Sequence, residues 1–246
     1  YYPLSPARIA DSRPASTVGD YSTRLSAGTV RKIQVAGRGG VPTSGAAAAV
    51  LNVTVTNTDS AGYLTVWPDG AGRPTASNLN WSPGQTVPNR VVVKLGAGAV
   101  DLYLPFGSTD VVVDVGGWIS DSSGDGTGSR YTPVAPVRIL DTRASQPIGP
   151  GQTLKVPVAG ASGLPATGLA AVAANATVTG PTSAGFLTAY PDDLPAPPTI
   201  SDLNFVAGQT VPALTVTRLG RGDGGIALYN LAGATQVVLD VLGYFS

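Results

Sequence analysis

Three charged side chains near the start of the chain have a spacing that suits ion pairing or anion binding. The pattern R-x-x-D-[ST]-R occurs twice, at Arg8, Asp11 and Arg13 and again at Arg138, Asp141 and Arg143. Guanidinium groups form paired hydrogen bonds with carboxylates and with sulfate or phosphate groups on sugars. The two clusters therefore predict either a recognition site for an anionic ligand or a structural clamp.

Two valine-rich runs, each with a single aspartate, favour the clamp. Asp114 lies in V-V-V-D-V-G-G-W (111–118), and Asp240 lies in V-V-L-D-V-L-G-Y (237–244). The runs are β-branched and too short to cross a membrane, so they predict buried strands. A buried carboxylate needs a cationic partner. We therefore expect the arginine clusters to pair with these aspartates and to tie the first segment of each domain to its last strand.

Aromatic residues recur at matching places in the two halves of the chain and form a second candidate site. A flat ring can stack on the face of a sugar. The candidates for such stacking are Trp67, Tyr190, Trp81 and Phe205. Trp67 and Tyr190 precede Pro-Asp turns, so we expect them at exposed strand ends. Filling of the hydrophobic core explains the same pattern and is the preferred interpretation.

The residue types on which most catalytic and metal sites depend are missing. The chain has no Cys, His or Met, and all of its 15 acidic residues are Asp. A catalytic triad, a thiolate nucleophile and an imidazole metal ligand are thereby excluded. Asp121, Ser123 and Asp125 match the first half of a calcium loop, but Thr132 stands where that loop needs Glu. We predict no enzyme, no cofactor and no metal, with calcium at these three residues as the alternative.

The composition also limits the possible partners. Lys and Arg number 15 and balance the 15 acids, and charged residues make up only 12% of the chain. Nucleic acid and anionic membrane surfaces both require a basic surface, so neither is an expected partner. The 32 Gly and 21 Pro are spread among alternating hydrophobic segments and predict turn-rich β structure.

The chain contains one unit twice. S-A-G-Y-L-T (60–65) returns as S-A-G-F-L-T (183–188), and G-Q-T-V-P occurs at 84–88 and at 208–212. The repeat predicts an all-β protein of two tandem antiparallel β-sandwich (jelly-roll-like) domains, residues 1–120 and 131–246, joined by a Gly/Ser/Asp linker, residues 121–130. The strands expected in the first domain are 29–36, 48–56, 62–67, 76–81, 89–95, 99–104 and 109–118.

The ordered motifs of both units resemble a known repeat. These motifs are Y-x-P-x-x-P-x-R-x-x-D-[ST]-R, V-A-G-x-x-G-[VL]-P, A-G-[YF]-L-T-x-[WY]-P, G-Q-T-V-P and V-x-D-V-x-G-[YW]. They are similar to a repeat of secreted, high-GC actinobacterial proteins, which occurs in tandem on surface proteins and beside peptidoglycan-amidase domains. The resemblance covers both units almost end to end and implies a secreted, extracellular or cell-surface location. It implies no specific activity.

We therefore expect a non-enzymatic structural surface protein. Its subunits would associate head to tail in an extracellular fibre, coat or wall-attached layer, because near-zero net charge and open strand edges promote association. The segment Tyr1–Pro6 is expected to be mobile and able to pair with a neighbour. The alternative function is a carbohydrate-binding module for cell-wall glycan.

Overall fold

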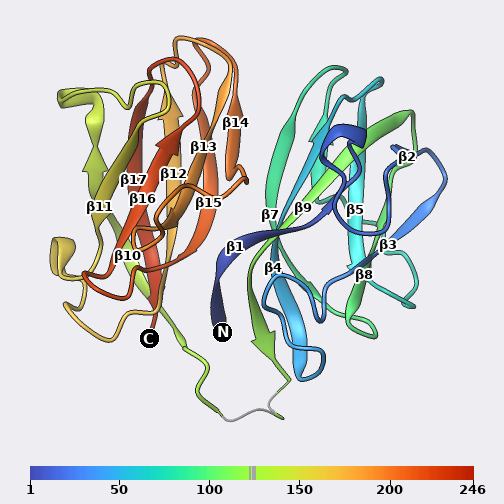
Figure 1. Ribbon diagram of the computed structural model, residues 1–246, viewed down its shortest axis with the longest axis horizontal. Helices are drawn as coiled ribbons and strands as arrows, with labels where there is room; N and C mark the ends of the chain where they lie inside the picture. Colours follow the sequence, from blue (N-terminus) through green and yellow to red (C-terminus); the bar gives the residue numbers. More distant parts are fainter. Residues whose placement is uncertain (122, 124–125) are drawn as a thin grey trace. The chain divides into compact units, whose positions relative to one another are not determined.

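The computed structural model describes residues 1–121, 123 and 126–246. The chain divides into two compact units (Figure 1). The N-terminal unit consists of Tyr2 and Leu4–Gly128, and the C-terminal unit consists of Ser129–Ser246 with Tyr1 and Pro3. Both units are built from antiparallel strands, and the helices among the described residues are single 3₁₀ turns at Pro14–Ser16, Thr142–Ala144 and Ala161–Gly163.

The N-terminal unit contains two sheets. The first has the order β1 (Tyr2–Asp11), β9 (Ser108–Ser120), β4 (Ala46–Thr56) and β7 (Val87–Lys94), with the short β2 (Leu25–Ser26) beside β9. The second has the order β3 (Val30–Gln34), β8 (Ala99–Tyr103), β5 (Gly62–Pro68) and β6 (Leu79–Trp81). The first strand thus lies beside the last, and most connections cross from one sheet to the other, apart from the paired neighbours β5 and β6 and the step from β1 to β2. This connectivity is that of a jelly roll.

The C-terminal unit has the same strand order in its two sheets. Its first sheet runs β10 (Tyr131–Asp141), β17 (Gln236–Phe245), β12 (Ala171–Thr179) and β15 (Val211–Arg218). Its second runs β11 (Thr153–Pro157), β16 (Gly225–Asn230), β13 (Gly185–Pro191) and β14 (Leu203–Phe205). The prediction of an all-β sandwich is confirmed.

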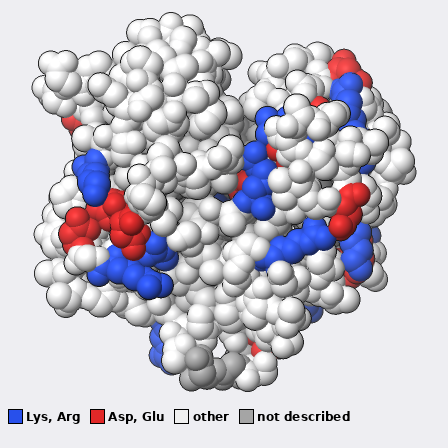
Figure 2. All heavy atoms as spheres, viewed as in Figure 1, with Lys and Arg blue, Asp and Glu red and all other residues white. Residues whose placement is uncertain are grey.

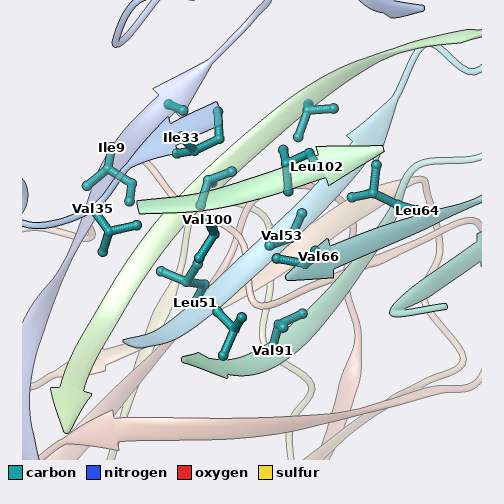
Figure 3. Packing of buried hydrophobic residues seen from close by; sticks show 14 of the residues in the cluster. Ile9, Ile33, Val35, Leu51, Val53, Leu64, Val66, Val91, Val100 and Leu102 are labelled. Atoms are coloured by element: carbon teal, nitrogen blue, oxygen red, sulfur yellow. The ribbon is translucent and has the colours of Figure 1, made fainter. Parts of the chain in front are cut away.

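Alternation of side chains along each strand builds the core between the two sheets. In the N-terminal unit, Leu51 and Val53 of β4 face Leu64 and Val66 of β5 (Figure 3), and all four are buried. The intervening residues point to the outer faces of the sheets. Two outer faces per unit are therefore the surfaces on which the strands can carry a site.

The first strand of the jelly roll corrects one expectation. Tyr1–Pro6 was predicted to be mobile, but Tyr2–Asp11 forms β1, which is hydrogen-bonded to β9. Prolines at positions 3 and 6 interrupt the sequence pattern of a strand, yet an edge strand tolerates proline because one of its sides needs no ladder donors. The described part of the chain contains no helix with the length and apolar character needed to cross a membrane.

Candidate functional site

The arginine cluster of the N-terminal unit joins its first strand to its last. Arg8 on β1 donates from Nε to Oδ1 of Asp114 on β9 at 2.9 Å and from Nη2 to Oδ2 at 3.4 Å. Its Nη1 donates to Oδ2 of Asp11 at 3.1 Å. One guanidinium therefore bridges two carboxylates, in the forked geometry that favours arginine over lysine.

Arg13 does not reach Asp114 by a hydrogen bond but closes a local ring with Asp11. Oδ1 of Asp11 accepts the backbone N–H and Nε–H of Arg13, and Oδ2 accepts Nη2–H at 2.6 Å. Burial raises the pKa of Asp11, but the side-chain and backbone hydrogen bonds from Arg13 outweigh that effect, so the pKa is lowered overall. Asp11 is thus held ionised between two arginines.

The C-terminal unit repeats this network with greater exposure. Arg138 donates to Asp240 at 2.8 and 3.1 Å and to Asp141 at 3.2 Å, and Arg143 donates to Asp141 at 2.6 Å. The Arg138 and Asp240 side chains are 48% and 25% exposed, against 17% and 2% for Arg8 and Asp114. The expectation of a buried clamp is therefore wrong for Asp240.

The alternation of the last strand explains how an aspartate fits within a valine run. Val113 and Val115 face the core of the N-terminal unit, and Leu239 and Val241 face that of the C-terminal unit. The aspartate between each pair points to the opposite face of its sheet. Each carboxylate therefore lies outside the hydrophobic core, and the arginine meets it on the outer face of the first sheet.

A hydroxyl within the same motif adds a connection that sequence reasoning missed. Ser12 Oγ donates to Asp110 Oδ1 at 2.8 Å and accepts the backbone N–H of Val111. Thr142 Oγ1 makes the equivalent pair of bonds with Gln236 Oε1 and the backbone N–H of Val237. The [ST] position in R-x-x-D-[ST]-R was the available signal, because a hydroxyl can accept and donate at once.

The four aromatic residues predicted for sugar stacking are buried, and the prediction that Trp67 and Tyr190 are exposed is wrong. Trp67, Tyr190, Trp81 and Phe205 are between 3% and 7% exposed. Trp67 Nε1 donates to Ala71 O at 3.0 Å, in the loop that follows β5. Trp81 Nε1 donates to Ser60 O at 3.0 Å. Trp81 and Phe205 pack within the hydrophobic cores, Trp67 and Tyr190 are covered as well, and none of the four presents an open face to a ligand.

The calcium candidate lies partly outside the described residues. Asp121 Oδ1 accepts the backbone N–H of Ser123 at 2.8 Å and also its hydroxyl, which lowers the pKa of Asp121. Asp125 is not among the described residues. Residues 1–121, 123 and 126–246 contain no group of three or more acidic side chains placed to hold a metal ion. The contacts of Asp121 are those of a local turn.

A pair of carboxyl groups lies between two loops of the C-terminal unit. Asp192 is buried, and burial and then its hydrogen bond to Asp223 raise its pKa. Its Oδ1 has no hydrogen-bond partner among the described residues, and a Cβ at Gly220 would lie 1.8 Å from it. A glycosidase needs two carboxyl groups set apart across a sugar bond. Asp192 and Asp223 interact directly with each other and so do not have that arrangement.

A hollow lies on the outer face of the second sheet of the N-terminal unit. Its volume is about 380 Å³, and it is lined by Tyr63 and Thr65 of β5, Asn80 of β6 and Arg73 of the loop between them. Arg73 stacks on the ring of Tyr103, with its Cζ 3.7 Å from the ring centroid. The hollow thus combines aromatic surface with hydrogen-bond donors and one cation.

The comparisons with known proteins add no family assignment to this geometry. No protein-family model matches the chain, and no curated protein matches it in sequence.

Proposed function

We propose that the chain is a non-enzymatic structural protein whose copies associate head to tail into an extracellular fibre, coat or wall-attached layer. The single observation that supports this most directly is the pair of edge strands β7 and β15. Each carries a large, exposed apolar side chain in the middle of a strand that has a hydrogen-bonded neighbour on only one side within its unit.

In the N-terminal unit, β7 pairs with β4 and with no other described strand of its unit. Val92 stands in the middle of β7 and is 60% exposed. An edge strand offers backbone donors and acceptors to a further strand, and an exposed valine adds apolar area to the contact. Pro88 near one end of β7 and Lys94 at the other limit indiscriminate pairing.

In the C-terminal unit, β15 occupies the equivalent edge beside β12. Leu214 is 44% exposed there, between Pro212 and Arg218. The two edges have different sequences, so pairing β7 of one copy with β15 of another is a heterologous contact. A heterologous contact repeats from copy to copy and generates an open filament, unless the rotation between neighbouring copies closes them into a ring.

The charge distribution also suits close packing of copies. The formal net charge is zero. Figure 2 shows a face that is mostly uncharged, with basic and acidic atoms gathered in small mixed clusters. Several charges of the chain are paired with one another, as in Lys32–Asp69 and Arg218–Asp193. Copies therefore approach one another with little long-range repulsion.

The extracellular location is part of the proposal. The chain lacks Cys and Met, the residues most readily oxidised outside the cell, and its motifs resemble a repeat of secreted proteins. Fractionation of the source cells, with an antibody against the chain, should find the protein in the wall fraction or the medium. Recovery from the cytosol alone would contradict this part.

Sedimentation velocity and electron microscopy over a range of concentrations test the association. The wild-type chain should form elongated oligomers, and Val92→Lys and Leu214→Lys should each weaken association about tenfold or more. Val206→Lys is the control, because Val206 is about as exposed as Val92 but lies in the turn before β15. A wild-type chain that stays monomeric at high concentration would refute the proposal.

Mixing the two variants distinguishes head-to-tail from symmetric pairing. Val92→Lys keeps an intact β15 edge, and Leu214→Lys keeps an intact β7 edge. A mixture should therefore form one good contact and stop at dimers, at concentrations where each variant alone stays mostly monomeric. If Leu214→Lys alone formed dimers as readily as the mixture, the contact would be symmetric and the head-to-tail arrangement would be wrong.

A further inference from the structure

The hollow between β5, β6 and their connecting loop has the parts of a binding site for a charged sugar. The half-buried ring of Tyr63 lies on its wall, and Asn80, directly opposite Tyr63 in the β5–β6 ladder, supplies an amide. An aromatic ring suits the apolar face of a sugar, and a planar amide suits its hydroxyl groups. Its volume of about 380 Å³ falls within the range of small-molecule sites.

Arg73 supplies the charge. Its guanidinium stacks on Tyr103 at 3.7 Å, and Arg73 forms no ion pair within the part of the chain that the structure describes. Most other arginines of the two units are paired with aspartates, as Arg8 and Arg138 are. Stacking holds the guanidinium plane in place while leaving its N–H groups available to a carboxylate.

The loop that carries Arg73 is fixed to the sheet at several points. Thr65 Oγ1 donates to Ala76 O at 2.6 Å, and Asn78 Oδ1 accepts the backbone N–H of Val66 at 2.8 Å. Asn80 Nδ2 donates to Ser77 Oγ at 3.2 Å. A loop ordered in this way loses little conformational entropy when a ligand binds, which favours affinity.

We propose that this hollow binds an acidic saccharide, with the sugar ring against Tyr63 and the sugar carboxylate on the guanidinium of Arg73. The polar groups of Asn80 and the loop bond to the sugar hydroxyls. An inorganic anion should bind more weakly because it gains no contact with the ring of Tyr63. An uncharged sugar should bind more weakly because it forms no ion pair with Arg73. The proposal does not depend on self-association and places glycan binding at residues other than the buried tryptophans.

The C-terminal unit has the same scaffold without the recognition groups. Thr188 Oγ1 donates to Ile200 O at 2.6 Å, as Thr65 does to Ala76. Phe186, however, stands where the N-terminal unit has Tyr63, and Pro197 stands where it has Arg73. We therefore expect one acidic saccharide per chain.

Isothermal titration of the full chain with trigalacturonate tests the site. The neutral comparator is the methyl ester of the same trisaccharide, and inorganic sulfate tests for simple anion binding. Trigalacturonate should bind with a stoichiometry of one, at least about tenfold more tightly than the ester or sulfate. No heat of binding with trigalacturonate, or equal affinity for sulfate, would overturn the proposal.

Variants assign the binding to the hollow. Arg73→Gln and Tyr63→Ala should each weaken trigalacturonate binding about tenfold, and only Arg73→Gln should abolish the preference over the ester. Arg221→Gln and Phe186→Ala are matched controls in the C-terminal unit and should bind as the wild type does. Because Tyr63→Ala removes packed area, Tyr63→Leu keeps the test valid if the alanine variant misfolds. Unchanged binding by Arg73→Gln would refute the assignment.

Discussion

Removal of the carboxylate charge at Asp114 should destabilise the N-terminal unit far more than the same change at Asp240 destabilises the C-terminal unit. Both aspartates occupy the middle of the last strand and accept two hydrogen bonds from an arginine on the first. They differ in solvent exposure, because the Asp114 side chain is 2% exposed and that of Asp240 is 25% exposed. The comparison therefore isolates the effect of burial on one kind of ion pair.

The magnitudes follow from that difference. Asp114→Asn removes one of the two carboxylates that the mostly buried Arg8 bridges and leaves it with Asp11 alone, which costs about 3 kcal/mol. Asp240→Asn breaks a pair that water already screens, and the cost should stay below about 1 kcal/mol. For a unit of this size, the first cost lowers the melting temperature by about 10 °C and the second by about 3 °C or less.

Hydrogen exchange of the full chain in increasing urea measures each unit separately, through peptides from β9 and from β17. Asp20→Asn is the control, because Asp20 pairs with Arg38 at the surface and its loss should cost less than about 0.5 kcal/mol. The double variant Arg8→Gln/Asp114→Asn should cost less than the sum of its single changes. Equal, small effects of Asp114→Asn and Asp240→Asn would refute the reasoning.

Three further substitutions test other contacts. Asp192→Asn should stabilise the C-terminal unit at pH 7 by about 1 kcal/mol, because the raised pKa of Asp192 means that its charged form is costly. The gain should shrink as the pH falls through that pKa, and urea unfolding at pH 4 and pH 7 would measure this. The pKa of Asp141 is shifted in the opposite direction, because the side-chain hydrogen bond from Arg143 lowers it. Its contribution to folding stability is therefore present above about pH 4 and is lost as the pH falls towards the folded-state pKa. Asp141→Asn should flatten the acid side of the curve of stability against pH. Trp67→Ala should cost about 3–5 kcal/mol without affecting trigalacturonate binding directly, and strong loss of binding in a chain that remains folded would show that the ring touches the ligand.

The strands followed from the sequence wherever side chains alternate. The expected strand 48–56 corresponds to β4 (Ala46–Thr56), and 109–118 lies within β9 (Ser108–Ser120). The first strand was missed because its prolines interrupt the pattern. Only a place at the sheet edge, which depends on the whole fold, permits those prolines.

The aromatic site shows where sequence reasoning stops. Tyr63 and Trp67 lie four residues apart on β5 and therefore point to the same outer face of the sheet. The loop after β5 folds back over Trp67, where Ala71 O accepts its indole N–H, while Tyr63 stays half exposed beside Arg73. Alternation specified the face, but the path of a loop decided which ring is open to a ligand.

The sequence by itself determined the β-sandwich, the strand periodicity and the recurrence of arginine and aspartate in both halves, because alternation and residue type are local properties. Tertiary structure decided that Arg8 bridges Asp11 and Asp114, that Asp240 is partly exposed, and that Arg73 meets Tyr103. Those outcomes depend on which segments, distant in sequence, pack on the outer face of each sheet. No local pattern encodes that packing, so the candidate binding hollow became visible only in the folded chain.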